Sequence, residues 1–519
     1  IPRAYIIVKN NTTSLQSTTD AKIIEITKFG GVSSGGLALT FSNITAALGF
    51  TPADSSNKQN SLATDGTGTK FPTVDAVKSR FDNYTTQRST ISEIRVMSGT
   101  LRNNLFYTTD LGKEGNWYYD ATDTTSADNL GTILVTADGK RIKRVFDNGT
   151  VSVLWFGAKA DWNTTLNTGT DNTESIQAAI DFARFDLKNV YNVFIPSGRY
   201  MTQQLILPYG IQLFGTGGVM ESSDRSGSRL YMKPATSVDM FRFSPNIDLA
   251  NNAKFWQGSI HHLELYGTTS ASAGWAINFK NSIGENVTPQ DLCRFHDLVV
   301  RNFKSGGIYL PAGGLPSFFD HLKIFFNGGP GILYEMSGGD LYQSQGSSFT
   351  NISGDANDGG LIRLKGLSEF GSVTIFNVKS ECRENTAFGT GKSQADAIVI
   401  ENCAKTRIKI IGGTHISSYS IGGVAQKPNS FIRVIGSSQP LLEWDNLVVR
   451  VRATDDSSNP YPSSVEGDGF KIDYKTSSGR LINSSNLASF EDRTLGYVSS
   501  QHGAFVVGEI EHYQNRSTI

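Results

Sequence analysis

Residues 259–267 read SIHHLELYG, and the same arrangement returns in FHDLVVRNF (295–303) and FFDHLKIFF (318–326). In each segment one apolar residue is followed three positions later by another, with polar residues between them. If the second apolar position is taken as a register mark, the marks are Leu263, Leu298, Leu322, Ile352, Val378, Ile411 and Leu447. Recurrence on this scale indicates stacked repeats, because each repeat buries its apolar face only against its neighbours.

A second short apolar run typically follows a mark after a turn. These runs are residues 306–310, 329–335, 359–364, 396–400, 430–434 and 469–473. No helical pattern separates the two runs, which argues against a β/α barrel or horseshoe. A propeller blade needs four strands in about 40 residues, and here there are two or three. The pattern therefore predicts an all-β fold, a right-handed parallel β-helix.

Composition and charge narrow the class of protein further. Among the 519 residues are 53 Gly and only 15 Pro, and 18% of the residues are charged, as in all-β proteins with many tight turns. Because 47 Lys+Arg balance 48 Asp+Glu, neither nucleic acid nor an anionic membrane surface is expected as a partner. No apolar run approaches the ~20 residues of a membrane helix. Residues 1–10 lack the pattern of a signal peptide, so no leader is expected there.

Motifs for metals, nucleotides and nucleophilic serine are weak in this chain. Cys293, Cys382 and Cys403 form no CxxC pair, so they are interpreted as buried small side chains rather than a disulfide framework or zinc site. His261-His262-x-Glu264 does not have a convincing metal spacing. The GxSxG match at 31–35 lacks the strand and helix of a nucleophile elbow and is interpreted as a turn. No cofactor and no metal are predicted.

The chain divides into three predicted regions. Residues 1–150 are rich in Asn, Thr, Ser and Gly and predict small β modules, with strands at Tyr5–Val8 and Ile133–Val135 and a short helix at Thr73–Phe81. Residues 151–475 hold the predicted β-helix. Residues 476–519 show no coil pattern and are expected to form a C-terminal oligomerisation segment.

A helix is predicted at the start of the second region, over residues 172–184. Asp171 and Glu174 have the spacing of a capping box. Ile176, Ala179, Ile180 and Ala183 follow at helical spacing, and a short buried strand is expected at Val193–Ile195.

This stretch resembles the pectate-lyase-like superfamily of β-helix proteins found in bacteriophage tailspikes. The matching residues are Phe156, Gly157, Ala158, Asp161, Asp171, Gln177, Ala178, Ala179, Ile180, Ile195, Pro196, Gly198 and Tyr200. The sequence departs from the family pattern in a longer stretch before the acidic cap and in Ser175, where the pattern has Ala. Upstream, ITAALGFTPADSSNKQ, KFPTVDAVKSRFD and the segment beginning GNWYYD resemble tailspike stalks and a particle-proximal module.

The resemblance implies a virion protein that acts at the host cell surface. Its relatives are homotrimers, attached to the phage tail or baseplate through the N-terminal region, and many depolymerise capsular polysaccharide by hydrolysis or elimination. In the family, the helix caps the start of the β-helix, and the β-helix carries receptor binding and catalysis.

Candidate catalytic residues follow from the register. Because stacked coils lie about 4.8 Å apart, residues at equal offset from the marks are vertical neighbours. Three positions after the marks lie Tyr266, Arg301, Phe325, Asp355, Glu381, Thr414 and Arg450, so Asp355 and Glu381 are expected to be adjacent. Asp358 and Glu384 coincide in the same way at offset six. Two carboxylates about 5 Å apart fit a retaining glycosidase, and a wider diagonal pair would favour inversion. The alternative is that these residues simply form solvated turns.

Candidate substrate-binding residues surround these positions. Lys379 and Arg383 are suited to an acidic sugar, and His262, Glu264, Trp256 and Tyr342 are predicted to contact sugar rings, although such side chains often only cover a sheet. One position before the marks lie His262, Asp297, His321, Asn351, Asn377, Ile410 and Asn446. For that row a structural role is favoured, with Asn side chains forming a hydrogen-bonded ladder.

Four functions stay open at this point. The first is endo-acting hydrolysis of capsular or exopolysaccharide, and the second is a lyase on the same substrate. The third is a receptor-binding spike without enzymatic activity. The fourth, a purely structural stalk, is disfavoured by the long irregular loops.

Overall fold

The computed structural model describes most residues from 86 to 418. The gaps are residues 102–104, 147–148, 184–191, 209, 218–226, 245–253, 257, 281–287, 291–292, 313–316, 337–345, 368–371, 382–384, 386 and 389–395. Outside 86–418 it describes residues 431–435 and the further strands named below. The predicted helix at Thr73–Phe81 and the GxSxG segment lie outside the described residues.

The chain forms two compact units. The first comprises Ile1–Ser89 and Met97–Tyr107. Its strands β1 (Tyr5–Lys9) and β2 (Ala21–Glu25) pair antiparallel, and β3 (Lys58–Gln59) pairs with β4 (Phe71–Pro72). Strands β5 (Gln87–Ser89) and β6 (Leu105–Thr108) are neighbours in a sheet.

The second unit begins with a small antiparallel module. It contains α3 (Ile91–Val96), β7 (Gly115–Asp120), β8 (Ile133–Val135) and β9 (Arg141–Arg144), and β9 pairs with both other strands. The Arg144 guanidinium lies 4.3 Å from the centre of the Trp117 ring and 4.4 Å from that of Trp155. It also donates to the carbonyls of residues 113, 114 and 131, so one buried cation ties the module together.

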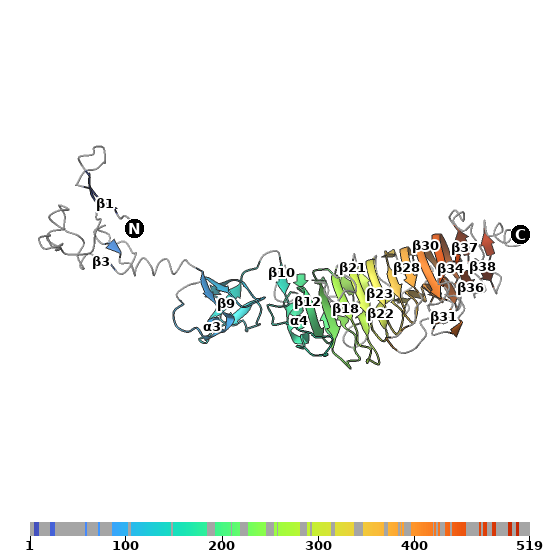
Figure 1. Ribbon diagram of the computed structural model, residues 1–519, viewed down its shortest axis with the longest axis horizontal. Coiled ribbons are helices and arrows are strands. Elements are labelled where there is room, and N and C mark those ends of the chain that lie inside the picture. Colours follow the sequence, from blue (N-terminus) through green and yellow to red (C-terminus); the bar gives the residue numbers. More distant parts are fainter. Residues whose placement is uncertain are drawn as a thin grey trace. The chain divides into compact units, whose positions relative to one another are not determined.

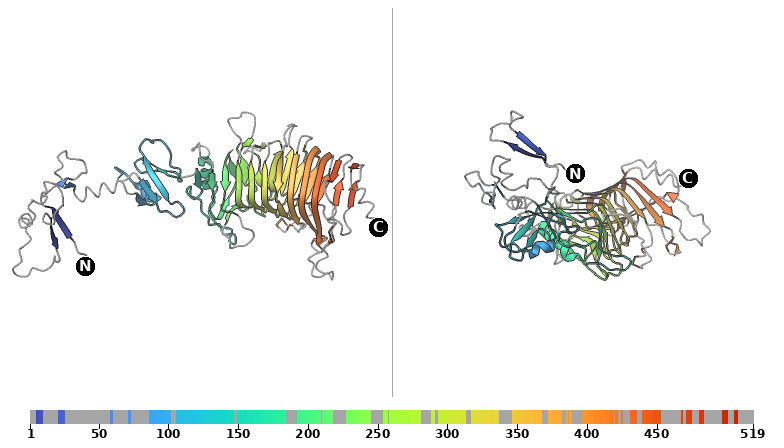
Figure 2. Two further views of the ribbon diagram at one scale, coloured as in Figure 1. Left: turned by 90° about the horizontal axis from the view of Figure 1, so that it is seen from above. Right: turned by 60° about the vertical axis from the view of Figure 1, so that its left-hand side comes forward.

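The predicted β-helix is confirmed. Successive strands of two long parallel sheets stack side by side (Figures 1 and 2). The first sheet follows the order β10 (Thr150–Ser152), β11 (Asn192–Phe194), β14 (Gln212–Phe214), β18 (Ser259–Tyr266), β21 (Arg294–Arg301), β23 (Phe318–Phe325), β25 (Ser347–Thr350), β28 (Ser372–Glu381), β30 (Ala404–Ser418), β34 (Gln439–Arg452), β37 (Arg480–Asn483) and β39 (Phe505–Val507). Four strands join it off this path, β12 (Gly198–Thr202), β15 (Ser228–Met232), β26 (Ser353–Asp355) and β35 (Gly467–Asp468).

The second sheet contains the second apolar run of each coil. Its order is β13 (Leu205–Leu207), β16 (Phe241–Phe243), β19 (Trp275–Asn278), β22 (Gly306–Ala312), β24 (Ile332–Met336), β27 (Ile362–Lys365), β29 (Ile398–Glu401), β33 (Ile432–Ile435), β36 (Lys471–Tyr474) and β38 (Tyr497–Ser500). Two small pairs lie outside both sheets, β17 (Lys254–Trp256) with β20 (Thr288–Gln290) and β31 (Ser420–Ile421) with β32 (Val424–Ala425).

The core lies between these sheets and is built from vertical columns of like side chains. Phe295, Phe319 and Phe349 are buried partners in successive coils, and their rings stack at centroid distances of 5.1 Å. Cys293 and Cys403 are buried, whereas Cys382 lies outside the described residues. Stacking of this kind removes apolar surface that no single coil could cover.

The five coils from β18 to β28 bend one position before the register mark. His262, Asp297, His321, Asn351 and Asn377 all have φ between 53° and 57° there. This left-handed backbone favours Asn, Asp and Gly, which explains the polar row that the sequence repeats. Part of the predicted ladder is present, since Asn377 Nδ2 donates to Asn351 Oδ1 at 2.8 Å and Asn351 Nδ2 to Asp320 Oδ1 at 3.0 Å.

One register mark was wrong. Val378 pairs with Gly413 rather than Ile411, so Ile416, not Thr414, follows Glu381 in its row. The left-handed residue of that coil is accordingly Gly412 rather than Ile410. A Cβ atom at Gly413 would lie 2.8 Å from the Phe431 ring, so Phe431 fills the space that the mark's side chain fills in other coils.

The helix α4 (Thr173–Asp181) confirms the predicted amphipathic helix, which ends earlier than residue 184. The capping box does not form. Asn172 is the N-cap residue without a side-chain cap bond, because its side chain binds the backbone of Lys159. Asp171 instead accepts hydrogen bonds from the amide and hydroxyl of Thr173.

Beyond residue 475 the coil pattern was predicted to stop, but β37, β38 and β39 continue both sheets in parallel. Their short apolar runs did not match the register used upstream. The oligomerisation role of 476–519 stays a prediction. Among the described residues, no helix has the length and apolar character needed to cross a membrane.

Candidate functional site

The two carboxylates expected to be neighbours are neighbours. Asp355 ends β26 and Glu381 ends β28, and the two residues are direct register partners. The side chain of Glu381 is only 13% exposed and lies 3.1 Å from Nζ of Lys379, which is 58% exposed. The predicted adjacency is thus confirmed, and it places a half-buried acidic pair beside one exposed ammonium group.

Asp358 is held in a turn next to this pair. Its amide donates to the carbonyl of Asn327, and its Oδ1 accepts a hydrogen bond from Nδ2 of buried Asn385 at 3.0 Å. Asn327 in turn donates to buried Asn357 at 2.8 Å. Asp358 therefore caps a buried amide network. Arg383 and Glu384 lie outside the described residues.

Aromatic rings and an arginine continue the row of the carboxylates along the sheet. Tyr231, Tyr266, Arg301 and Phe325 are successive register partners leading to Asp355. The rings of Tyr231 and Tyr266 stack 4.5 Å apart, and the Arg301 guanidinium lies 4.9 Å from the centre of the Phe325 ring. We call this set, with Asp355 and Glu381, the aromatic–acidic row.

Glu264 supports this row from beneath. Its side chain is 1% exposed, forms an ion pair with Arg229 at 3.0 Å, and accepts the Tyr266 hydroxyl at 2.8 Å. Glu264 thus positions Tyr266. It is buried, whereas the sequence predicted that it would contact a sugar. The side chains of Trp256 and Tyr342 lie outside the described residues.

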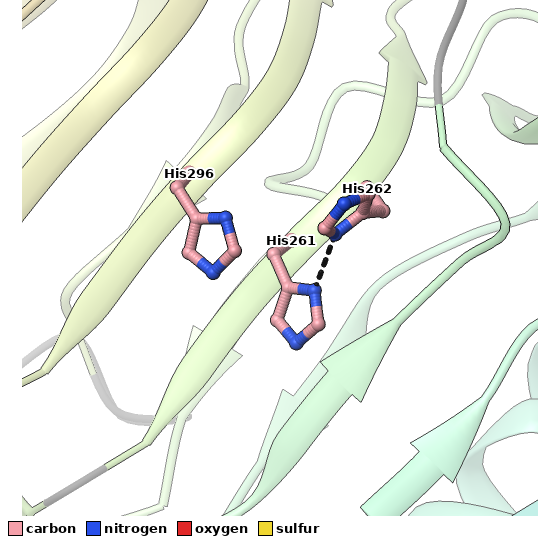
Figure 3. A group of neighbouring side chains, drawn as sticks. All are labelled: His261, His262 and His296. Carbon is pink, nitrogen blue, oxygen red and sulfur yellow. Dashed lines mark hydrogen bonds between the residues drawn. The ribbon is translucent and has the colours of Figure 1, made fainter.

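A second group of polar side chains lies on the same sheet, several coils closer to α4. We call it the histidine cluster, and it consists of His261 and His262 on β18, His296 and Asp297 on β21, and His321 on β23. His261 and His296 are register partners, and their rings stack 4.6 Å apart, as Figure 3 shows. The Nδ1 atoms of His261 and His262 are 2.7 Å apart.

Asp297 is the shared acceptor of the histidine cluster. Its Oδ2 lies 2.7 Å from Nδ1 of His296 and 3.6 Å from Nε2 of His262, and its Oδ1 lies 3.0 Å from Nδ1 of His321. Partial burial opposes ionisation of Asp297, but the His296 hydrogen bond and the neighbouring histidines outweigh it, so its pKa lies below the usual value. Burial, together with the adjacent His296 and His262, lowers the pKa of His261 to about 4, which keeps its ring neutral at pH 7.

Comparison with known proteins adds an independent line of evidence. Residues 87–147 match the family of the phage tail protein small four-stranded beta-sheet domain. The β-helix resembles the enzymatically active domain of bacteriophage CBA120 tailspike protein 2, with a TM-score of 0.50, 15% identity, and coverage of 84% of this chain and 58% of that one. A segment that matches a phage tail domain therefore precedes a β-helix whose fold is that of the CBA120 protein.

Two further proteins to which the chain is similar come from phages. It is 34% identical over 93 residues, 18% of its length, to a capsule K3-specific depolymerase of Klebsiella phage KP32, and spans 10% of that relative. A tailspike of Acinetobacter baumannii bacteriophage Fri1, a capsular polysaccharide depolymerase, has a TM-score of 0.46 and 12% identity over 82% of this chain and 75% of that one. The structural likenesses show the fold alone.

The sequence contained a signal for the histidine cluster that was given a structural interpretation. At offsets two and one before three consecutive marks, the coils carry His261-His262, His296-Asp297 and Asp320-His321. The second position of each pair, taken alone, favours a hydrogen-bonded ladder, because Asn occupies the same position in later coils. Comparing both positions together would have shown four histidines and two carboxylates on one small patch.

Proposed function

We propose that the protein is a phage tailspike that binds and depolymerises host capsular or exopolysaccharide, with Asp355 and Glu381 as the catalytic pair. The observation that carries this proposal is their pairing on adjacent coils of β26 and β28. Adjacent strands lie about 4.8 Å apart, close to the roughly 5–5.5 Å between the two carboxyl groups of retaining glycosidases. Retaining endo-glycosidic hydrolysis is therefore the chemistry that the spacing favours.

The neighbours of each carboxylate suggest its role. Lys379 is ion-paired with Glu381, and a nearby ammonium group favours the charged form that a nucleophile needs. We therefore assign Glu381 as the nucleophile and Asp355 as the acid that protonates the leaving oxygen. In the second step Asp355 takes the proton from the attacking water, because one group serves as acid and then as base in a retaining reaction.

The substrate-binding surface in this proposal is the aromatic–acidic row. Sugar rings present apolar faces that stack on aromatic side chains, which suits Tyr231 and Tyr266. Arg301 adds a planar guanidinium, which suits a carboxylate, and Lys379 adds an exposed ammonium group. Together these groups favour a polysaccharide that contains an acidic sugar.

Partners and placement belong to the same proposal. Residues 1–150, which include the phage tail domain, attach the protein to the tail or baseplate of the virion. The active form is a homotrimer, and residues 476–519 contribute to its assembly. The phage tail domain and the tailspike-type β-helix support this arrangement.

Amide substitutions test the catalytic pair directly. Asp355→Asn and Glu381→Gln should each lower the rate of capsule cleavage by roughly 10²–10⁴-fold, measured by mass spectrometry of released fragments. Asp358→Asn is the matched control, because its side chain caps a turn, and it should retain most of the activity. Wild-type rates in both amide variants would overturn the assignment.

A lyase acting on the same substrate is the second candidate. The positive charges of Arg301 and Lys379 favour it, since either side chain could neutralise a uronic acid carboxylate while a basic side chain removes the adjacent proton. Elimination leaves an unsaturated sugar, so ultraviolet absorbance that grows during digestion would select the lyase. Binding without any change in polysaccharide size would select a non-enzymatic spike.

A further inference from the structure

The histidine cluster has donor atoms arranged around a common centre. One nitrogen from each of His261, His262 and His296 lies within 4.8 Å of the other two. Two of the residues come from β18 and the third from β21, so the group bridges two coils (Figure 3). All three side chains are half-buried, which limits the number of water molecules that compete for their nitrogens.

Asp297 holds two of these histidines from outside the group. Its Oδ2 lies 2.7 Å from Nδ1 of His296 and 3.6 Å from Nε2 of His262, while the Nδ1 atoms of His261 and His262 are 2.7 Å apart. Ligands placed tetrahedrally about 2.1 Å from a zinc ion are about 3.4 Å from one another. The three histidine nitrogens lie within 4.8 Å of one another, so turning the imidazole rings toward a common centre brings them to the separation that zinc requires.

The surrounding hydrogen bonds orient the donors. His321 Nδ1 lies 3.0 Å from Oδ1 of Asp297, which leaves Oδ2 directed at His262 and His296. Carboxylates and histidines fixed in this way are characteristic of metal sites, where outer partners hold the ligands in position. The Nδ1–Nδ1 contact of His261 and His262 has room for one proton only, so at least one of these nitrogens presents a lone pair inward.

We propose that the histidine cluster binds one Zn²⁺ ion through His261, His262 and His296, with water as the fourth ligand and Asp297 as an outer partner. Three imidazoles form a donor set that suits zinc rather than calcium or magnesium. The ion cross-links β18 and β21 at their left-handed bends, beside the start of the aromatic–acidic row. This site does not depend on whether the protein cleaves polysaccharide.

The test is metal content of the full chain produced without a polyhistidine tag. After incubation with Zn²⁺ and dialysis, inductively coupled plasma mass spectrometry should find one zinc per chain in the wild type. His261→Gln and His296→Gln should lose it. The matched control is His321→Gln, which should keep the stoichiometry and lose at most about 10–100-fold in affinity, as for an outer partner. Circular dichroism shows whether each variant retains its β-structure.

A second measurement uses the unmodified chain and so does not depend on variants that fold. Diethylpyrocarbonate labelling, read by peptide mass spectrometry, should be blocked by Zn²⁺ at His261, His262 and His296. Co²⁺ in place of Zn²⁺ should give the intense visible absorption of a four-coordinate site. Zinc content that does not exceed that of the dialysis buffer, or equal zinc in the wild type and His296→Gln, would overturn the proposal.

Discussion

Breaking the buried ion pair between Arg229 and Glu264 should strongly destabilise the part of the sheet around Tyr266. In Arg229→Met, the Glu264 carboxylate keeps its buried place, 1% exposed, without the guanidinium 3.0 Å away. Removing one partner of a buried pair costs about 3–5 kcal/mol, because the remaining charge is left uncompensated. That cost multiplies the opening constant of the surrounding strands by roughly 10²–10⁴.

Hydrogen–deuterium exchange of the peptides that contain β15 and β18 measures this opening directly, since exchange reports local rather than global stability. The double variant Arg229→Met/Glu264→Leu should regain most of the protection, because it removes both charges together. The control is Lys365→Met, which breaks the 2.7 Å pair with Glu335, whose side chains are 39% and 22% exposed, and should cost at most about 1 kcal/mol. Unchanged exchange in Arg229→Met would show that Glu264 is hydrated, and the view of Glu264 as a support for Tyr266 would then be wrong.

Three further predictions test the coil geometry. Phe319→Ala should lower the free energy of unfolding by about 3–5 kcal/mol, because the Phe319 ring stacks between Phe295 and Phe349 in the core. Faster unfolding in guanidinium measures this loss, and an unfolding rate equal to that of the wild type would contradict the stacked core. Asn377→Val should lower the free energy of unfolding by about 1–2 kcal/mol, since Asn377 has a φ of 53°, whereas Asn377→Gly should leave it nearly unchanged. Equal melting temperatures for the two variants would argue against a left-handed bend. Burial raises the pKa of the Cys403 thiol to about 12, so at pH 8 iodoacetamide should label this thiol only in the unfolded chain. Peptide mass spectrometry measures the labelling, and rapid labelling of the native protein would refute the burial of Cys403.

Much of the β-helix could be predicted because apolar residues recur at the same positions in each coil. The first three marks are partners in successive strands, since Leu263 pairs with Leu298 and Leu298 with Leu322. The prediction failed where a side chain from another part of the coil takes the place of the mark. At Gly413 the apolar volume comes from Phe431, which directly precedes β33, and no local pattern reveals such an exchange.

Only part of the candidate site could be predicted from the sequence. The pairing of Asp355 with Glu381 follows from the register alone, because both residues lie three positions after a mark. The burial of Glu264 could not be predicted, because it depends on Arg229, thirty-five positions earlier in the chain and on another strand. The histidine cluster depends on side chains from three strands meeting at one carboxylate, Asp297, which a comparison of single rows does not show.

Proton nuclear magnetic resonance of host capsular polysaccharide, recorded during digestion by the protein, tests the central claim most directly. With Asp355 and Glu381 on adjacent strands, which are about 4.8 Å apart, the first new reducing ends should carry the anomeric configuration of the linkage that was cut. Reducing ends of the opposite configuration would contradict that spacing as the catalytic geometry. Vinyl signals from an unsaturated sugar would contradict hydrolysis itself.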